Sequence, residues 1–178
     1  MPLFRDGRLV GDAWTFVADG APLPAGPVAV GKTRFLAERA TLIARDEPIG
    51  LILDPGETLD GIADDLPRFA LVALRFARFA DGRPYSIARR LRDVHGFTGE
   101  LRATGDVLRD QITFMLRAGF DSLDVSDAGT ADALRSGRLV VVRRHYQTAS
   151  RRAAEATPPG AAWRRISDPP GSGEPTPA

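Results

Sequence analysis

Between residues 49 and 125 the chain alternates short apolar runs with amphipathic stretches, and no other feature constrains its fold as strongly. The apolar runs have the length and bulk of buried strands, as in IGLIL at 49–53 and FALVALRF at 69–76. Strands joined through helices by short connections make right-handed crossovers and pair in parallel. We therefore predict an α/β fold, with strands that begin near residues 49, 69, 99, 120 and 139.

Two architectures are compatible with this alternation. A mostly parallel sheet built from βα units is either an open doubly wound sheet or a partial (β/α) barrel, and spacing along the chain does not distinguish them. Ahead of the alternation, Asp6-Gly7 stands between two short apolar runs, which predicts a short N-terminal β-hairpin. The stretch GAPLPAGP at 20–27 is expected to be a loop.

Helical spacing and end signals predict five helices, which cover residues 32–45, 57–66, 85–96, 106–119 and 127–137. In the helix predicted over 32–45, the residues expected to share an apolar face are Phe35, Leu36, Leu42 and Ile43. In the helix predicted over 57–66, they are Leu59, Ile62, Ala63 and Leu66. Asp106 is expected to cap the start of the fourth helix, and Gly96 and Gly119 to end the third and fourth.

The chain of 178 residues is long enough for one domain with a real core. We predict a single α/β domain over residues 1–148. The remaining stretch, 149–178, holds six of the 14 prolines and loses the alternating pattern, so we expect a disordered tail.

Composition excludes several classes of function. The sequence has no cysteine and only two histidines, which excludes thiolate and iron–sulfur chemistry and leaves no basis for a histidine metal site. A net charge of +1 provides no general attraction to nucleic acid. The N-terminus lacks a secretory signal and no apolar run is long enough to span a membrane, so we expect a cytoplasmic protein. No dinucleotide-binding fingerprint is present, and we predict no cofactor.

Arginines gather directly after the strand predicted at 69–76. In parallel α/β folds, ligands bind at the carboxyl ends of the strands, so this connection belongs to the ligand-binding edge. The next helix directs free backbone N–H groups towards the same edge, which favours an anion. The predicted anion-binding residues are Arg75, Arg78, Arg83, Tyr85, Ser86, Arg102 and Gln111. Asp54 also follows a predicted strand at this edge.

Each of these residues also has an ordinary structural interpretation. Asp81 and Asp106 are candidate catalytic bases, but Asp81 precedes a glycine as turn residues do, and Asp106 stands where a helix cap is expected. Arg89, Arg90 and Arg92 are expected to be solvated charges on the polar face of the helix.

The stretch GPVAVGKT, Gly26 to Thr33, matches the phosphate-loop pattern of nucleotide-binding proteins. Its context is poor, because GAPLPA and not a buried strand precedes it. Pro27 to Val30 are typical of extended apolar chain and not of a compact loop of backbone N–H groups. Nucleotide binding through Lys32 therefore stands as the weakest alternative.

Three stretches carry a family resemblance: FARFADGRPYSIARRLR at 76–92, GFTGELRATGDVLRDQ at 96–111 and RAGFD at 117–121. With LPAGPVAV near the N-terminus, they resemble the bacterial domain of unknown function 934 family. Members of this family are commonly labelled oxidoreductase-like proteins of sulfite reduction and are encoded beside the sulfite reductase haemoprotein. Three positions depart from the family pattern: Ala77 replaces a proline, Pro84 a glycine and Ala118 a cysteine.

The resemblance implies an accessory or oxidoreductase-like protein of assimilatory sulfite reduction, with the sulfite reductase haemoprotein as partner and a small anion as ligand. The chain cannot be the reductase itself, because it has no cysteine to hold the iron–sulfur cluster which that reaction needs. An alternative from another class is a barrel-type enzyme that binds a phosphate or carboxylate substrate through Arg75, Arg78 and Arg83, with Asp81 or Asp106 as base.

Overall fold

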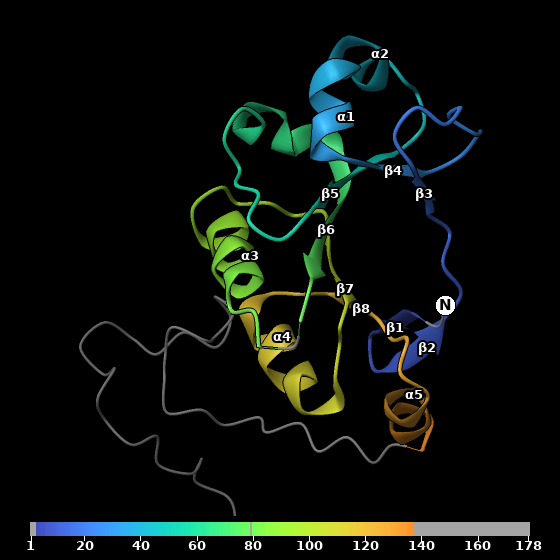
Figure 1. The fold of residues 1–178 in the computed structure, drawn as a ribbon, viewed down its shortest axis with the longest axis vertical. Helices are drawn as coiled ribbons and strands as arrows, with labels where there is room; N and C mark the ends of the chain where they lie inside the picture. The colour runs from blue at the N-terminus through green and yellow to red at the C-terminus, as the bar shows by residue number, and fades with distance from the viewer. Residues whose placement is uncertain (1–2, 79, 137–178) are drawn as a thin grey trace, which may run out of the picture. The chain divides into compact units, whose positions relative to one another are not determined.

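The computed structural model describes residues 3–78 and 80–136. One eight-stranded sheet forms its centre, with the strand order β2-β1-β8-β7-β6-β5-β4-β3 (Figure 1). The strands are β1 (Leu3–Arg5), β2 (Arg8–Val10), β3 (Thr15–Val17), β4 (Val28–Gly31), β5 (Ile49–Leu53), β6 (Phe69–Phe76), β7 (Glu100–Gly105) and β8 (Ser122–Asp124). The strands predicted near 49, 69, 99 and 120 are confirmed.

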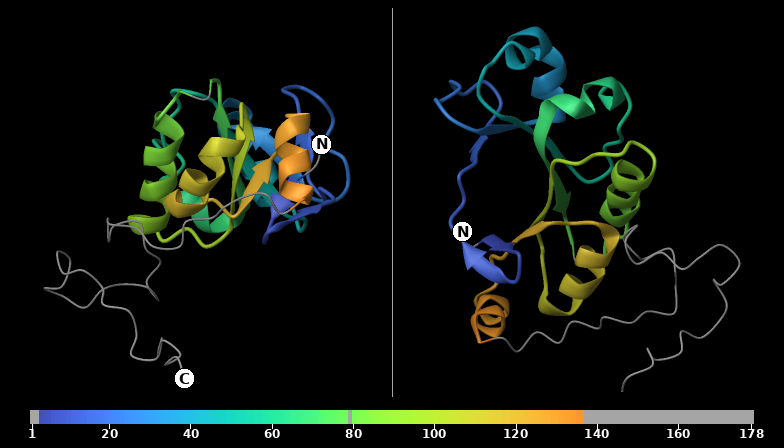
Figure 2. Two further views of the ribbon diagram at one scale, coloured as in Figure 1. Left: turned by 90° about the horizontal axis from the view of Figure 1, so that it is seen from below. Right: turned by 180° about the vertical axis from the view of Figure 1, so that it is seen from behind.

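Strands β3 to β8 lie side by side in chain order, and each pairs in parallel with the next. Since right-handed crossovers that all move in one direction put their helices on one face, the sheet has a covered face and a bare one. It curls around the bare face into half of a barrel (Figure 2). A doubly wound sheet needs a reversal of strand order. The partial barrel is therefore confirmed, and the doubly wound alternative is wrong.

The helices cover the convex face of this sheet. They are α1 (Lys32–Ala37), α2 (Arg39–Ile43), α3 (Arg83–Asp93), α4 (Ile112–Ala118) and α5 (Ala128–Arg135), with 3₁₀ turns at Ala63–Arg68 and Arg109–Gln111. A single apolar core lies between helices and sheet, and the buried side chains Phe35, Leu91, Met115 and Leu134 all belong to it. Gly119 ends α4 at a φ of 104°, as predicted. Gly96, at a φ of 62°, follows the end of α3.

The N-terminal hairpin is confirmed. Asp6 and Gly7 have φ angles of 50° and 79°, as a two-residue turn of type I′ requires, and they join β1 to β2. Strand β1 also pairs antiparallel with β8, with Leu3 opposite Asp124. Strands β3 and β4 were not predicted as part of the sheet. They add two parallel strands at its other edge, so the sheet begins well before residue 49.

Two predicted helices differ from the structure. The helix expected over 32–45 breaks at Glu38, where φ is −110°. Phe35 and Leu42 are buried as expected, whereas Leu36 is exposed. The stretch 57–66 forms turns and a 3₁₀ helix, not an α-helix, although Leu59, Ile62 and Leu66 are buried. Gly61 at a φ of 78° and Pro67 within the 3₁₀ turn explain why no α-helix forms there.

The concave face carries side chains in layers. Its apolar layer contains Ala29, Leu71 and Ala73, and Trp14 packs against them. Gly50 makes room for the indole: a Cβ there would lie 3.1 Å from Trp14 and 3.1 Å from the Cβ of Leu71. The segment 11–14, which runs from β2 to β3, thus crosses from one edge of the sheet to the other over the concave face (Figure 1).

Some predictions fall outside the described residues. These are the strand expected near 139 and the tail expected over 149–178, and with them the boundary at residue 148. Within residues 3–78 and 80–136, no helix combines the length and apolar character needed to cross a membrane.

Candidate functional site

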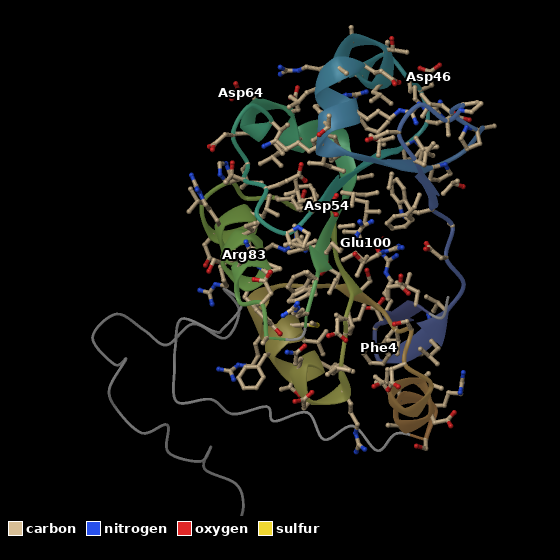
Figure 3. All side chains as sticks on the ribbon, in the orientation of Figure 1. Phe4, Asp46, Asp54, Asp64, Arg83 and Glu100 are labelled. Atoms are coloured by element: carbon tan, nitrogen blue, oxygen red, sulfur yellow. The ribbon has the colours of Figure 1, made fainter. Side chains whose placement is uncertain are left out.

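A small hollow opens at the carboxyl ends of β5 and β6. The loop 54–56, Arg75 and the start of α3 at Arg83 surround it, over a floor that includes Leu53 and Leu74. Counting the space open to solvent, it measures about 200 Å³. Figure 3 labels Asp54 and Arg83, which reach this region from the end of β5 and the start of α3. Two of the predicted anion-binding arginines, Arg75 and Arg83, therefore meet at one site.

Arg83 is held by a two-point contact with Asp81. Its Nε and Nη2 donate to the two oxygens of the Asp81 carboxylate at 2.9 and 2.7 Å, and its backbone N–H donates to Oδ1 at 3.0 Å. These hydrogen bonds from Arg83 lower the pKa of Asp81 to about 2. The third nitrogen, Nη1, lies over Gly56, where a Cβ would come within 3.4 Å of it. Asp81 thus fixes the guanidinium with one edge turned to the hollow.

Arg75 forms the other side of the hollow. Its Nη1 lies 2.8 Å from Oδ1 of Asp54, and both side chains are about half exposed, at 50% and 53%. The backbone N–H of Asp54 donates to the Glu57 carboxylate at 2.7 Å, which shapes the turn after β5. Arg75 and Asp54 were both placed at this edge from the sequence, but their pairing was not foreseen.

The other predicted site residues lie elsewhere. Arg78 and Ser86 are exposed around the start of α3. The Tyr85 ring packs edge-on against Phe76, with centroids 5.2 Å apart, and burial raises the pKa of its hydroxyl. Gln111 immediately precedes α4. The structure does not bring these residues into one cradle with Arg75 and Arg83.

Asp106 is not the cap that the sequence predicted. The helix starts later than expected, with a 3₁₀ turn from Arg109 and the α-helix from Ile112. The backbone N–H of Asp106 instead donates to the carbonyl of Phe76 at 3.0 Å, directly beyond Gly105. Gly105 has a φ of 87°, and a Cβ there would lie 2.4 Å from the Phe76 carbonyl oxygen. The turn ends β7 by a close approach to β6.

Arg102 lies on the concave face, within the sheet and not at its carboxyl edge. Its side chain is 1% exposed, and its guanidinium donates to Glu100 at 2.8 Å and to Asp12 at 2.7 Å. Ser122 and Arg5 also donate to the Glu100 carboxylate. All three guanidinium nitrogens of Arg102 donate to these carboxylates, so Arg102 holds the concave face together.

The sequence reasoning missed the carboxylates of this face. Burial raises the pKa of Asp124, which lies at the end of β8 on the same face as Arg102. The sequence does indicate a polar face on this strand: in ELRAT at 100–104, polar and apolar residues alternate, as they do on a strand with one polar and one apolar face.

Arg92 is not a solvated charge. Its guanidinium donates to the carbonyls of Gly119 at 3.1 Å and Gly99 at 3.0 Å, and it also contacts the Phe97 carbonyl and the Asp121 carboxylate. It therefore ties α3 to the strands on either side of α4. The prediction holds better for Arg90, which is exposed, whereas Arg89 pairs with Asp93 at 2.8 Å.

The phosphate-loop motif has the wrong geometry. Val28 to Gly31 form the buried strand β4, as the extended apolar interpretation required, and α1 starts at once from Lys32. The Lys32 ammonium donates to the carbonyl of Thr58 at 2.8 Å. No loop separates strand from helix here, so the segment lacks the cradle of N–H groups that binds phosphates.

The fold and the hollow define a class: a half-barrel α/β protein with arginines at the carboxyl ends of its parallel strands. Residues 50–157 match a family described as "Bacterial protein of unknown function (DUF934)". The chain belongs to this family. The matched segment starts within β5 and therefore contains the whole hollow. No curated protein and no solved structure matches the chain.

Proposed function

We propose that this is a cytoplasmic accessory or oxidoreductase-like protein of assimilatory sulfite reduction. It acts with the sulfite reductase haemoprotein and binds a small anion at the hollow between Arg75 and Arg83. The pathway rests on the family resemblance of the stretch 76–121, and the anion site rests on the hollow itself.

One observation carries the anion site: the orientation of Arg83. Asp81 occupies its Nε and Nη2, and the remaining Nη1 faces the hollow beside Gly56. An arginine fixed in this way loses little conformational freedom when it binds an oxyanion. The N–H group of Tyr85 belongs to the first turn of α3, where helix geometry provides no intrahelical acceptor. It lies at the same end of the helix as the Arg83 guanidinium.

A deletion strain tests the pathway. It is expected to grow poorly with sulfate as the sulfur source and normally with cysteine. The wild-type gene and Arg90→Ala should restore growth on sulfate, and Arg83→Ala should not. Arg90 is the matched control, because it is an exposed arginine on the same helix. Normal growth of the deletion strain on sulfate would refute the pathway. Co-purification with the reductase tests the partnership.

A further inference from the structure

The hollow contains an acceptor as well as donors. Asp54 lines it together with Arg75 and Arg83, and its carboxylate is 53% exposed. The charges around it balance, because Arg75 is paired with Asp54 and Arg83 with Asp81. An ionised carboxylate only accepts hydrogen bonds. Any ligand that reaches both guanidinium groups therefore also meets a group that repels bare anionic oxygens.

We propose that the hollow selects a singly charged oxyanion that keeps a hydrogen-bond donor. This inference rests on the proposed anion site and specifies its ligand class. The ionised oxygens of the ligand accept from Nη1 of Arg83 and from the N–H groups of Arg75 that do not bind Asp54. The protonated oxygen donates to the Asp54 carboxylate. A fully deprotonated dianion brings two charges into a balanced site and has no proton for Asp54, so it binds weakly.

The orientation of Asp54 supports this assignment. Arg75 contacts Oδ1, and the Glu57 carboxylate holds the backbone N–H of Asp54. The carboxylate is 53% exposed, so it can also accept a hydrogen bond from a ligand in the hollow. The arrangement differs from a site lined only by arginines, in which the most highly charged oxyanion would bind best.

Three tetrahedral anions of similar size test the proposal with the full-length protein. At pH 6, inorganic phosphate carries one charge and two protons, sulfate carries two charges and no proton, and perchlorate carries one charge and no proton. Chemical-shift titration of backbone amides gives an affinity for each anion and locates its site. We expect phosphate to bind about tenfold more tightly than sulfate or perchlorate, the size of one lost hydrogen bond to a charged group.

Asp54→Asn is the decisive variant, because an amide keeps the size of the side chain and adds a donor. It should bring sulfate to within about threefold of phosphate. Asp64→Asn is the matched control: Asp64 is exposed and outside the hollow, so the same loss of charge there should leave the tenfold preference intact (Figure 3).

The outcomes separate this inference from the proposed function. If none of the anions shifts amides around residues 54–56 and 83–86, the anion site itself is refuted. If sulfate binds as tightly as phosphate to the wild type, the anion site stands and the donor requirement is wrong. If perchlorate binds as tightly as phosphate, the charge of the anion alone determines its affinity, and Asp54 does not act as the acceptor.

Discussion

The guanidinium carbon of Arg102 on β7 lies 5.7 Å from the centre of the Phe16 ring on β3, although three strands separate β7 from β3 in the sheet. In a flat sheet, strands four positions apart are roughly 19 Å from each other. The contact is therefore a direct measure of how strongly the sheet curls. Arg102 thus bridges two strands that are distant in the strand order, across the concave face.

Arg102→Ala should destabilise the protein by about 3–5 kcal/mol, because it removes the cation that Asp12 contacts and leaves the buried Glu100 carboxylate with only the partly exposed Arg5 as a cation among the described residues. Urea unfolding measures the change. Phe16→Ala serves as the comparison: its ring is 40% exposed, and we expect a loss of at most about 1 kcal/mol. A similar loss of stability in both variants would mean that the ion pairs of Arg102 do not stabilise the fold.

Arg92→Ala should lower stability by about 1–3 kcal/mol, since it removes a partly buried donor from the carbonyls of Gly119 and Gly99. Arg90→Ala, on the exposed face of the same helix, should change stability by only a few tenths of a kcal/mol. Thermal unfolding of both variants checks the difference. Equal melting temperatures would restore the view of Arg92 as a solvated charge.

The ion pair between Asp81 and Arg83 predicts a pH dependence. The pKa of Asp81 falls from 3.8 to about 2 on folding. The ionised Asp81 therefore contributes its full stabilisation at a pH above 3.8, and this contribution is lost as the pH drops through about 2. Carboxyl carbon NMR of Asp81 should show a midpoint near 2 in the wild type. In Arg83→Ala the midpoint should return to the ordinary range of aspartate. An unchanged midpoint would show that Arg83 does not hold the carboxylate in solution.

Gly50→Ala should loosen the segment 11–14, because the added methyl group meets Trp14 and Leu71 at 3.1 Å. We expect a loss of about 1–3 kcal/mol, typical of overpacking, and a red shift of indole fluorescence as Trp14 becomes more exposed. Trp163, which lies outside the described residues, is replaced by phenylalanine both in the Gly50→Ala variant and in the reference protein that keeps Gly50. Trp14 is then the only tryptophan that contributes to the fluorescence. Unchanged emission would indicate that Trp14 does not pack on Gly50.

Much of the sheet could be predicted, because its inner strands have a clear sequence signal, a continuous run of apolar residues. IGLIL and FALVALRF are covered by helices on one side and packed on the other over much of their length, so they read as continuous apolar runs. The strands β3 and β4 could not be found in the same way. They are three and four residues long and flank a loop rich in proline and glycine, so they show no period that separates them from extended loop.

The candidate site could be predicted in position but not in its pairings. That Arg75 and Arg83 lie at a ligand-binding edge follows from the rule for parallel strands. Which carboxylate each one contacts depends on how neighbouring strands are registered, and Asp54 reaches Arg75 only because Leu53 and Leu74 are aligned. Asp12 is 90 residues from Arg102 along the chain, and Arg92 meets carbonyls of two separate segments, one at Phe97 and Gly99 and the other at Gly119. No local pattern carries such information.

The pairing of β1 with β8 has a consequence for synthesis on the ribosome. The first strand to leave the exit tunnel finds its partner only when residues 122–124 have emerged, since Leu3 lies opposite Asp124. Until then the nascent hairpin has no sheet to join, and the growing parallel strands keep an open edge next to β7. Such late, non-local pairing slows folding and exposes unpaired strand edges. Stalling translation before residue 122 should therefore yield a protease-sensitive chain that matures quickly once β8 is released.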